Sequence, residues 1–216
     1  MALNSALVVG LDGTVDPLSV TAASVVAARD DGRPLASRMG AAAGQVVVEL
    51  EVDEALLADP PDTVVVRLLG LPSPHAVSTL DGRRLAAPAT FRFRVTAALE
   101  PRGSAPARLL DIDGHAPAPG LEIVAAGPLV IRLDGVLDPA SLSPETCPLF
   151  PLENGLVLSS PLRPAVTWRC TGERFELRLG LGDQHGRFQL DLRRFGWRDL
   201  SGGIPEPTLV AEVAAP

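Results

Sequence analysis

The sequence contains no lysine, so all 19 basic residues are arginines, and the net charge is −7. No basic cluster occurs, and phosphate binding needs clustered positive charge, so nucleic acid is not expected as a partner. No apolar run approaches the ~20 residues that cross a bilayer, which argues against membrane insertion. The lack of lysine, together with abundant alanine and 21 prolines, indicates a high-GC bacterial genome.

Cysteine and histidine are also scarce. The two cysteines, Cys147 and Cys170, are too few for a disulfide framework. The three histidines, His75, His115 and His185, are scattered along the chain, so a zinc site is not expected. No glycine-rich phosphate loop and no G-x-S-x-G nucleophile motif is present. We therefore expect no enzymatic activity and no cofactor.

An internal repeat organises the chain. Residues 7–20 read LVVGLDGTVDPLSV and residues 129–142 read LVIRLDGVLDPASL, an offset of 122 positions. A match this dense predicts two copies of one module. Residues 99–106, rich in proline and without periodicity, are expected to be a linker between modules at 1–98 and 107–216.

Apolar residues alternate with polar ones in the segments 91–95, 175–179 and 188–192. Successive side chains of a strand point to opposite faces, so the alternation predicts antiparallel sheets with one solvated side. Only residues 53–58 favour a helix, which Pro60 and Pro61 would end. The pattern predicts an all-β chain with two tandem antiparallel β-sandwich domains. The residues expected to face the two cores are Leu7, Val9, Leu11, Leu129, Ile131 and Leu133.

The repeated LDG-x-x-DP-x-S motif, followed near the end of each module by a turn rich in aspartate and glycine, resembles the bacterial Ig-like domain family. Its modules occur in tandem in S-layer and other cell-surface proteins. The resemblance covers nearly the whole chain, although Arg83 and Gly203 stand where the family usually has asparagine. It implies immunoglobulin-like folds with structural, spacer or adhesive roles and no catalytic residues.

These observations favour a non-catalytic structural, spacer or interaction module pair of a bacterial cell-envelope or secreted protein. Two alternatives are a carbohydrate- or protein-binding module acting through its loops and the accessory domains of an exported enzyme. The expected partners are other domains of a larger envelope protein, another protein or a glycan. No signal peptide follows Met1, and the expected first strand at 107–111 has no counterpart in module one. Both features predict an N-terminally shortened piece of a larger extracellular or cell-envelope protein; the alternative is that the linker or a partner chain supplies the strand.

Paired aspartates in the repeated turns, Asp12 with Asp16 and Asp134 with Asp138, admit two interpretations. Carboxylates suit calcium, but each turn has only two of them against the roughly 6–8 oxygens that calcium takes. Aspartate before glycine and before proline also shapes turns through its own hydrogen bonds. The turn-shaping interpretation is therefore favoured.

A weak calcium candidate is the set Asp111, Asp113 and Glu122, which matches three positions of a calcium-binding loop. Ala116 stands where such a loop needs glycine, and no helices flank the segment. We expect no metal site there.

The two tryptophans and the two cysteines complete the set of candidate residues. Trp197, at the end of a strand, is the candidate for an exposed contact residue, whereas Trp168 is expected to face the core. Cys147 and Cys170 both fall at expected inward positions. They form either a disulfide within module two or two buried free thiols.

Overall fold

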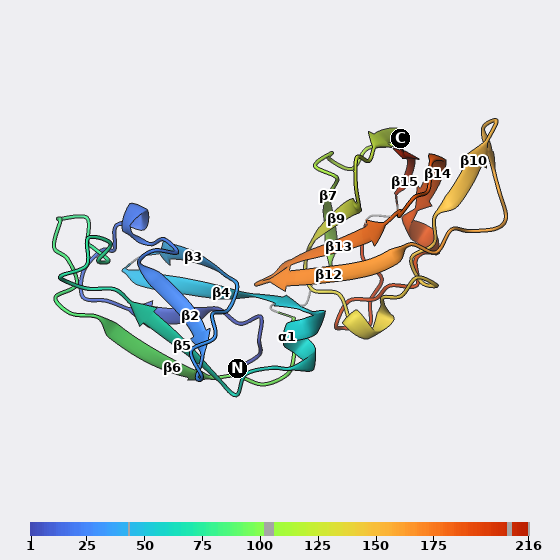
Figure 1. Ribbon diagram of the computed structural model, residues 1–216. Helices are drawn as coiled ribbons and strands as arrows, with labels where there is room; N and C mark the ends of the chain where they lie inside the picture. Colours follow the sequence, from blue (N-terminus) through green and yellow to red (C-terminus); the bar gives the residue numbers. More distant parts are fainter. Residues whose placement is uncertain (43, 102–105, 207–208, 216) are drawn as a thin grey trace. The chain divides into compact units, whose positions relative to one another are not determined.

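The computed structural model describes residues 1–42, 44–101, 106–206 and 209–215, and the chain is all-β with several antiparallel sheets (Figure 1). It divides into two compact units, Met1–Glu100 and Pro101–Pro216. The boundary lies within the expected linker, of which residues 102–105 fall outside the described part. No helix among the described residues is long and apolar enough to cross a membrane.

Two sheets make up the first unit. In one of them β4 lies between β1 and β3, antiparallel to both, and in the other the order is β2-β5-β6. The apolar residues of β4 alternate between buried and half-buried positions, as a strand between core and solvent requires. The strands are β1 (Leu7–Gly10), β2 (Val25–Arg29), β3 (Ser37–Ala42), β4 (Gln45–Asp53), β5 (Thr63–Leu68) and β6 (Ala89–Arg94).

The expected short helix is present as α1 (Glu54–Ala58), directly after β4. The side chain of Asp53 caps its first turn by accepting a hydrogen bond from the backbone N–H of Leu56. Pro60 and Pro61 follow, where a proline cannot continue a helix.

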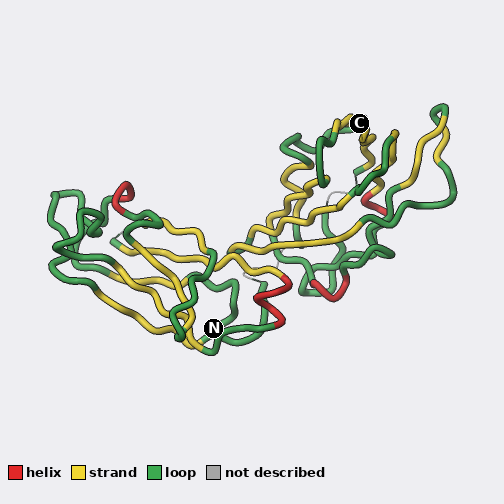
Figure 2. The backbone as a smooth tube through the Cα atoms, viewed as in Figure 1, coloured by secondary structure: helices red, strands yellow, loops and turns green. Residues whose placement is uncertain are grey.

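Two sheets also make up the second unit, with the orders β12-β13-β9-β7 and β11-β10-β14-β15-β8. Figure 2 shows that strands and loops make up most of the described backbone and that the helical segments are short. Every pair is antiparallel except β15 with β8, which is parallel. The strands are β7 (Arg108–Ile112), β8 (Leu121–Val124), β9 (Leu129–Asp134), β10 (Phe150–Glu153), β11 (Leu156–Val157), β12 (Ala165–Thr171), β13 (Arg174–Gly180), β14 (Gly186–Asp191) and β15 (Val210–Ala215).

The predicted core residues of the repeat lie inside both units. Leu7 and Val9 are buried, as are Leu129, Ile131 and Leu133, which confirms the register at these positions. Leu11 is only half-buried, because β1 ends at Gly10 whereas β9 continues to Asp134. The longer strand has an additional neighbour, since β7 pairs along β9 up to Asp134.

Strand pairing repeats between the units. Each has a strand flanked on both sides, β4 by β1 and β3 and β13 by β9 and β12. Each also has a second sheet in which β2-β5-β6 corresponds to β10-β14-β15. Two strands lack a full counterpart in the first unit. Within the described residues nothing occupies the place of β7, and a single parallel bridge from Ala2 to Thr96 stands where β8 pairs with β15.

Candidate functional site

The aspartates of the repeated turns act on the backbone. Asp16 and Asp138 precede single 3-10 turns, η1 (Pro17–Ser19) and η2 (Pro139–Ser141), at the repeat offset of 122. In both turns an aspartate Oδ1 accepts a hydrogen bond from the backbone N–H two residues later, at 3.0 Å. The turn-shaping interpretation of these two aspartates is confirmed.

A serine after each aspartate ties the turn to a distant segment. Ser19 Oγ donates to the Asp16 carbonyl at 2.8 Å and accepts from the backbone N–H of Ser78 at 3.0 Å. Ser141 Oγ donates to the Asp138 carbonyl at 2.7 Å and accepts from the N–H of Arg198 at 2.9 Å. Each hydroxyl therefore connects the start of its module to the segment before its last strand.

The most connected charged cluster surrounds Glu176 on β13. This carboxylate is only 9% exposed. It accepts hydrogen bonds from Arg132 Nε at 3.1 Å, from Arg169 at 3.2 Å and from Arg178 Nε at 2.7 Å. Arg132 also donates to Asp111 Oδ1 on β7 at 2.9 Å. Three arginines and two carboxylates from four neighbouring strands thus form one network with a net positive charge.

Electrostatics within this cluster favour the ionised carboxylate. Burial opposes the charge on Glu176, but hydrogen bonds from Arg169 and Arg178 outweigh it and hold the pKa of this carboxyl below its ordinary value. The pKa of Arg132 is raised, because its bonds to Asp111 and Glu176 outweigh its own partial burial. A guanidinium has five N–H donors, so Arg132 and Arg178 retain donors that can face water.

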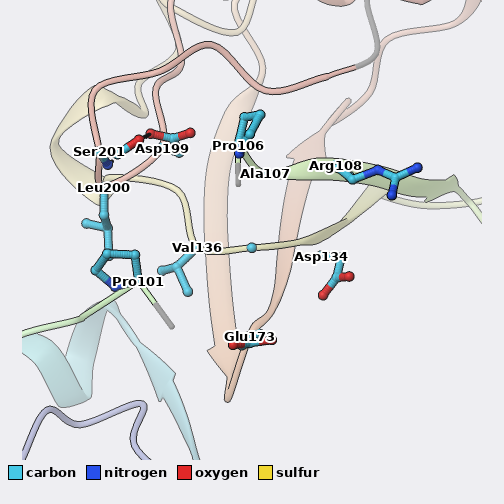
Figure 3. A pocket seen from close by; sticks show the side chains of 11 residues that line it. Pro101, Pro106, Ala107, Arg108, Asp134, Val136, Glu173, Asp199, Leu200 and Ser201 are labelled. Carbon is cyan, nitrogen blue, oxygen red and sulfur yellow. Dashed lines mark hydrogen bonds between the residues drawn. The ribbon is translucent and has the colours of Figure 1, made fainter. Parts of the chain in front are cut away.

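A small pocket lies in the second unit beside the turn that contains Asp199 (Figure 3). Its volume is about 130 Å³. Figure 3 shows Asp199 and Ser201 together on one wall, with Asp134 and Glu173 apart from them. Binding sites for drug-sized ligands run to roughly 300–1,000 Å³, so this pocket is small for such a ligand. Its acidic groups do not converge on one point.

Asp199 organises the turn next to this pocket. Its Oδ1 accepts hydrogen bonds from the N–H of Ser201 at 2.9 Å, from Ser201 Oγ at 2.5 Å and from the N–H of Gly203 at 2.8 Å. Burial opposes the charge, yet these bonds and the backbone N–H of Ala107 lower the pKa of the Asp199 carboxyl. No well-aligned donor among the described residues reaches its buried Oδ2.

Gly203 is explained by the same carboxylate. A Cβ at this position would lie 2.9 Å from Asp199 Oδ2, closer than real Cβ atoms come. Any larger residue would displace the carboxylate, which accounts for glycine at this position.

The weak calcium candidate does not assemble. Asp111 lies on β7 and is bonded to Arg132 and to the N–H of Gly114. Glu122 lies on β8, in the other sheet, where its exposed side chain is 4.0 Å from Arg187. Asp113 lies in the turn after β7. The described residues contain no group of three or more His, Cys, Asp or Glu side chains that could hold a metal ion.

Trp197 is not an exposed contact residue, and this prediction is wrong. The side chain is 2% exposed and packs edge-on against Phe195, with ring centroids 5.1 Å apart. Trp168 is buried as expected and stacks on Phe175 at 5.5 Å. Both tryptophans therefore belong to the core of the second unit.

The two cysteines are free and buried. Cys170 Sγ donates to the carbonyl of Gly172 at 3.4 Å, and Cys147 Sγ lies 3.9 Å from Thr146 Oγ1. Burial raises the pKa of the Cys147 thiol to about 11, which makes it a poor nucleophile at neutral pH. The structure thus has the free-thiol arrangement, and oxidation to a disulfide stays a prediction.

The Glu176 cluster was not predicted from the sequence. The sequence signal for this cluster is the alternation of charged with apolar residues in two strands, which places the charged side chains on the outer face. These charged residues are Arg132 on β9 and Glu176 and Arg178 on β13. Alternation assigns these residues to one face, but only the strand register places Arg132 directly opposite Glu176.

Comparison with known proteins adds no relative. No protein-family model matches the chain, and no curated protein matches it significantly.

Proposed function

We propose that the chain is a pair of immunoglobulin-like β-sandwich modules with a structural, spacer or interaction role in a bacterial cell-envelope or secreted protein. The family resemblance of the repeated motif supports this role, as does the all-β architecture of both units. The modules carry the role through their fold, without catalytic chemistry.

The observation that carries the proposal is the duplicated turn. Asp16 and Asp138 make the same hydrogen bond at the same 3.0 Å distance, and Ser19 and Ser141 make the same cross-links. Residues shared by both copies therefore serve backbone geometry. Features outside the shared turn differ between the copies, as at the position of Asp199, where the first unit has Thr79.

The state of the buried carboxylates supports the same role. Glu176, Asp191 and Asp199 are all nearly buried, and all accept hydrogen bonds from arginines or backbone groups. Each of these partners lowers the pKa of its carboxyl. A general acid or base at neutral pH needs a raised carboxyl pKa. Lowered values are typical of carboxylates that stabilise a fold.

Force spectroscopy on the full chain tests the structural role. Between two reference domains, the chain should give two separate unfolding events, one for each module. Ser19→Ala should weaken one event and Ser141→Ala the other, because each serine cross-links its own module. One cooperative event, or a force too small to detect, would contradict a spacer that withstands tension.

A binding role through the Glu176 cluster is the second candidate. The network has a net positive charge, although the whole chain carries −7. An anionic glycan or acidic protein is the partner that such a surface would favour. Screening the chain against acidic glycans, with Arg178→Gln as the matched variant, separates the candidates. Saturable binding that this variant abolishes would favour the binding module.

A further inference from the structure

The outer edge of β1 differs from its counterpart in the second unit. β1 is the end strand of its sheet and pairs with β4 alone among the strands of the first unit. Its counterpart β9 pairs with β13 on one side and with β7 on the other. This edge of the repeated sheet is therefore covered by a strand in the second unit, whereas none of the described strands of the first unit covers it there.

Backbone groups on this edge point away from β4. Leu11 donates its N–H to the Gly44 carbonyl at 3.0 Å, so the backbone N–H and C=O groups of the odd-numbered residues point toward β4. The N–H and C=O groups of Val8 and Gly10 consequently point outward, because the direction alternates along a strand. The counterpart of Val8 is Val130, whose carbonyl accepts a hydrogen bond from the N–H of Asp113, just beyond β7, at 2.7 Å.

β7 shows what this kind of edge accepts. It is an extended segment that runs antiparallel to β9, with a register shift between Leu109 and Asp111. Leu109 is 8% exposed and Ile112 is fully buried, so β7 adds apolar side chains to the core as well as hydrogen bonds. The segment that fits such an edge is thus an extended peptide with two apolar side chains that face the core.

The turn at the end of each edge has the same conformation but a different neighbour. Gly13 and Gly135 have φ values of 110° and 111°. A Cβ at Gly135 would lie 2.8 Å from the Cα of Ala107, directly before β7. At Gly13 the nearest atoms are a methyl group of Thr79 at 3.1 Å and the flexible end of Arg83. Among the described residues, the backbone that leads into β7 thus has no counterpart beside Gly13.

Nothing on β1 itself protects the edge. The strand reads LVVG, with no charge and no proline, and Val8 is 43% exposed. Native proteins usually guard an open edge with charged residues, proline or a bulge. An uncharged edge favours the addition of another strand.

We propose that the outer edge of β1 binds, in trans, an extended peptide segment with the pattern of β7, antiparallel to β1. A second copy of β1 is a poorer occupant, because its Leu7 and Val9 are already buried in their own core. A β1–β1 pair would therefore add hydrogen bonds without burying further apolar surface there. Such binding adds a partner to the structural role proposed above and does not require that role.

Amide hydrogen exchange on the full chain tests the proposal, with a synthetic peptide of residues 106–114, PARLLDIDG, as the probe. Without peptide, the Val8 and Gly10 amides should exchange rapidly, while the covered Arg132 amide is protected. Saturating peptide should slow exchange at Val8 and Gly10 about tenfold or more. A control peptide with serine in place of the residues corresponding to Leu109 and Ile112 should have no effect.

Two variants keep the outcome interpretable. Val8→Pro removes one outward N–H without affecting the bonds between β1 and β4, and Val8→Lys places a charge on the exposed position. Either should abolish the protection of Gly10 by peptide, while Val130→Lys in the covered strand should not.

Unchanged exchange at Val8 and Gly10 with millimolar peptide would overturn the proposal. Protection that rises with protein concentration alone would assign the edge to a second copy and overturn it as well.

Discussion

Thr79 and Asp199 occupy the same position of the duplicated turn, and in this turn the hydroxyl and the carboxylate have exchanged places. In the first unit Thr79 Oγ1 donates to the carboxylate of Asp81, two residues later. In the second unit Ser201 Oγ donates to the carboxylate of Asp199, two residues earlier. The turn is conserved in geometry although the donor and acceptor side chains are reversed.

This exchange can be tested by introducing the residues of the first unit's turn into the turn of the second unit. Asp199→Thr should destabilise the second unit by about 1–3 kcal/mol, because buried donors of the turn lose their acceptor. Adding Ser201→Asp to this variant should restore part of the loss. The measurement is urea-induced unfolding monitored by tryptophan fluorescence, since Trp168 and Trp197 both lie in the second unit. A double variant as unstable as the single one would show that the turn does not tolerate the exchange.

The Glu176 cluster predicts an acid-sensitive contribution to stability. The folded pKa of Glu176 lies below its ordinary value of 4.5, so its contribution is present at neutral pH. It is lost as the pH falls below 4.5 and through the lowered folded value. Glu176→Gln should lower the free energy of unfolding at pH 7 by about 1–3 kcal/mol, since the arginines are partly solvated.

The same variant should lose less stability between pH 7 and pH 3 than the unaltered chain. Glu145→Gln is the control, because Glu145 pairs with Arg163 at an exposed position and its loss should matter less. Parallel pH profiles for Glu176→Gln and the unaltered chain would contradict the assignment.

The burial of both cysteines predicts that a thiol reagent labels them slowly in the folded chain. With the pKa of Cys147 at about 11, only about a thousandth of this thiol is ionised at pH 8, and the group is buried as well. A thiol reagent should therefore react with neither cysteine in the folded chain within minutes. After unfolding without reductant, both should react. Labelling of neither thiol under those conditions would show that Cys147 and Cys170 are oxidised.

The two cross-linking serines predict matched losses. Ser19→Ala and Ser141→Ala should each cost about 1–2 kcal/mol, because each removal leaves backbone groups without their partner. The losses should be independent, since the serines belong to different units. Thermal unfolding of the single and double variants by calorimetry measures both effects. A single calorimetric transition whose midpoint both substitutions lower would show that the modules unfold as one.

Local relations along the chain were predictable, and relations across strands were not. The burial of Leu129 and Ile131 follows from alternation, and the cap by Asp138 follows from its position before proline. The burial of Trp197 does not, because the turn η3 (Leu192–Arg194) after β14 interrupts the alternation before Phe195. No periodic pattern continues across such a turn.

The same limit applies to the candidate sites. Asp111 and Glu122 match calcium-loop positions, but they belong to different sheets, and spacing alone does not assign strands to sheets. The Glu176 cluster depends on the registers of β9, β12 and β13, which tertiary packing determines. Residues that act through one turn can thus be identified from sequence, whereas residues that meet across a sheet cannot.

The parallel pairing of β8 with β15 has a mechanical consequence. The two strands pair over four residues, from Leu121 with Ala211 to Val124 with Ala214. Tension that draws the start of β8 and the end of β15 apart acts along both strands. It loads these hydrogen bonds together in shear, whereas a peeling geometry would break them one at a time. In the described part of the first unit a single bridged pair, Ala2 with Thr96, lies in this place, and Leu3 and Asn4 bond to Ala98 and Glu100 just beyond it. Under an increasing pull the first module should therefore yield at the lower force and lengthen the chain while the second remains folded.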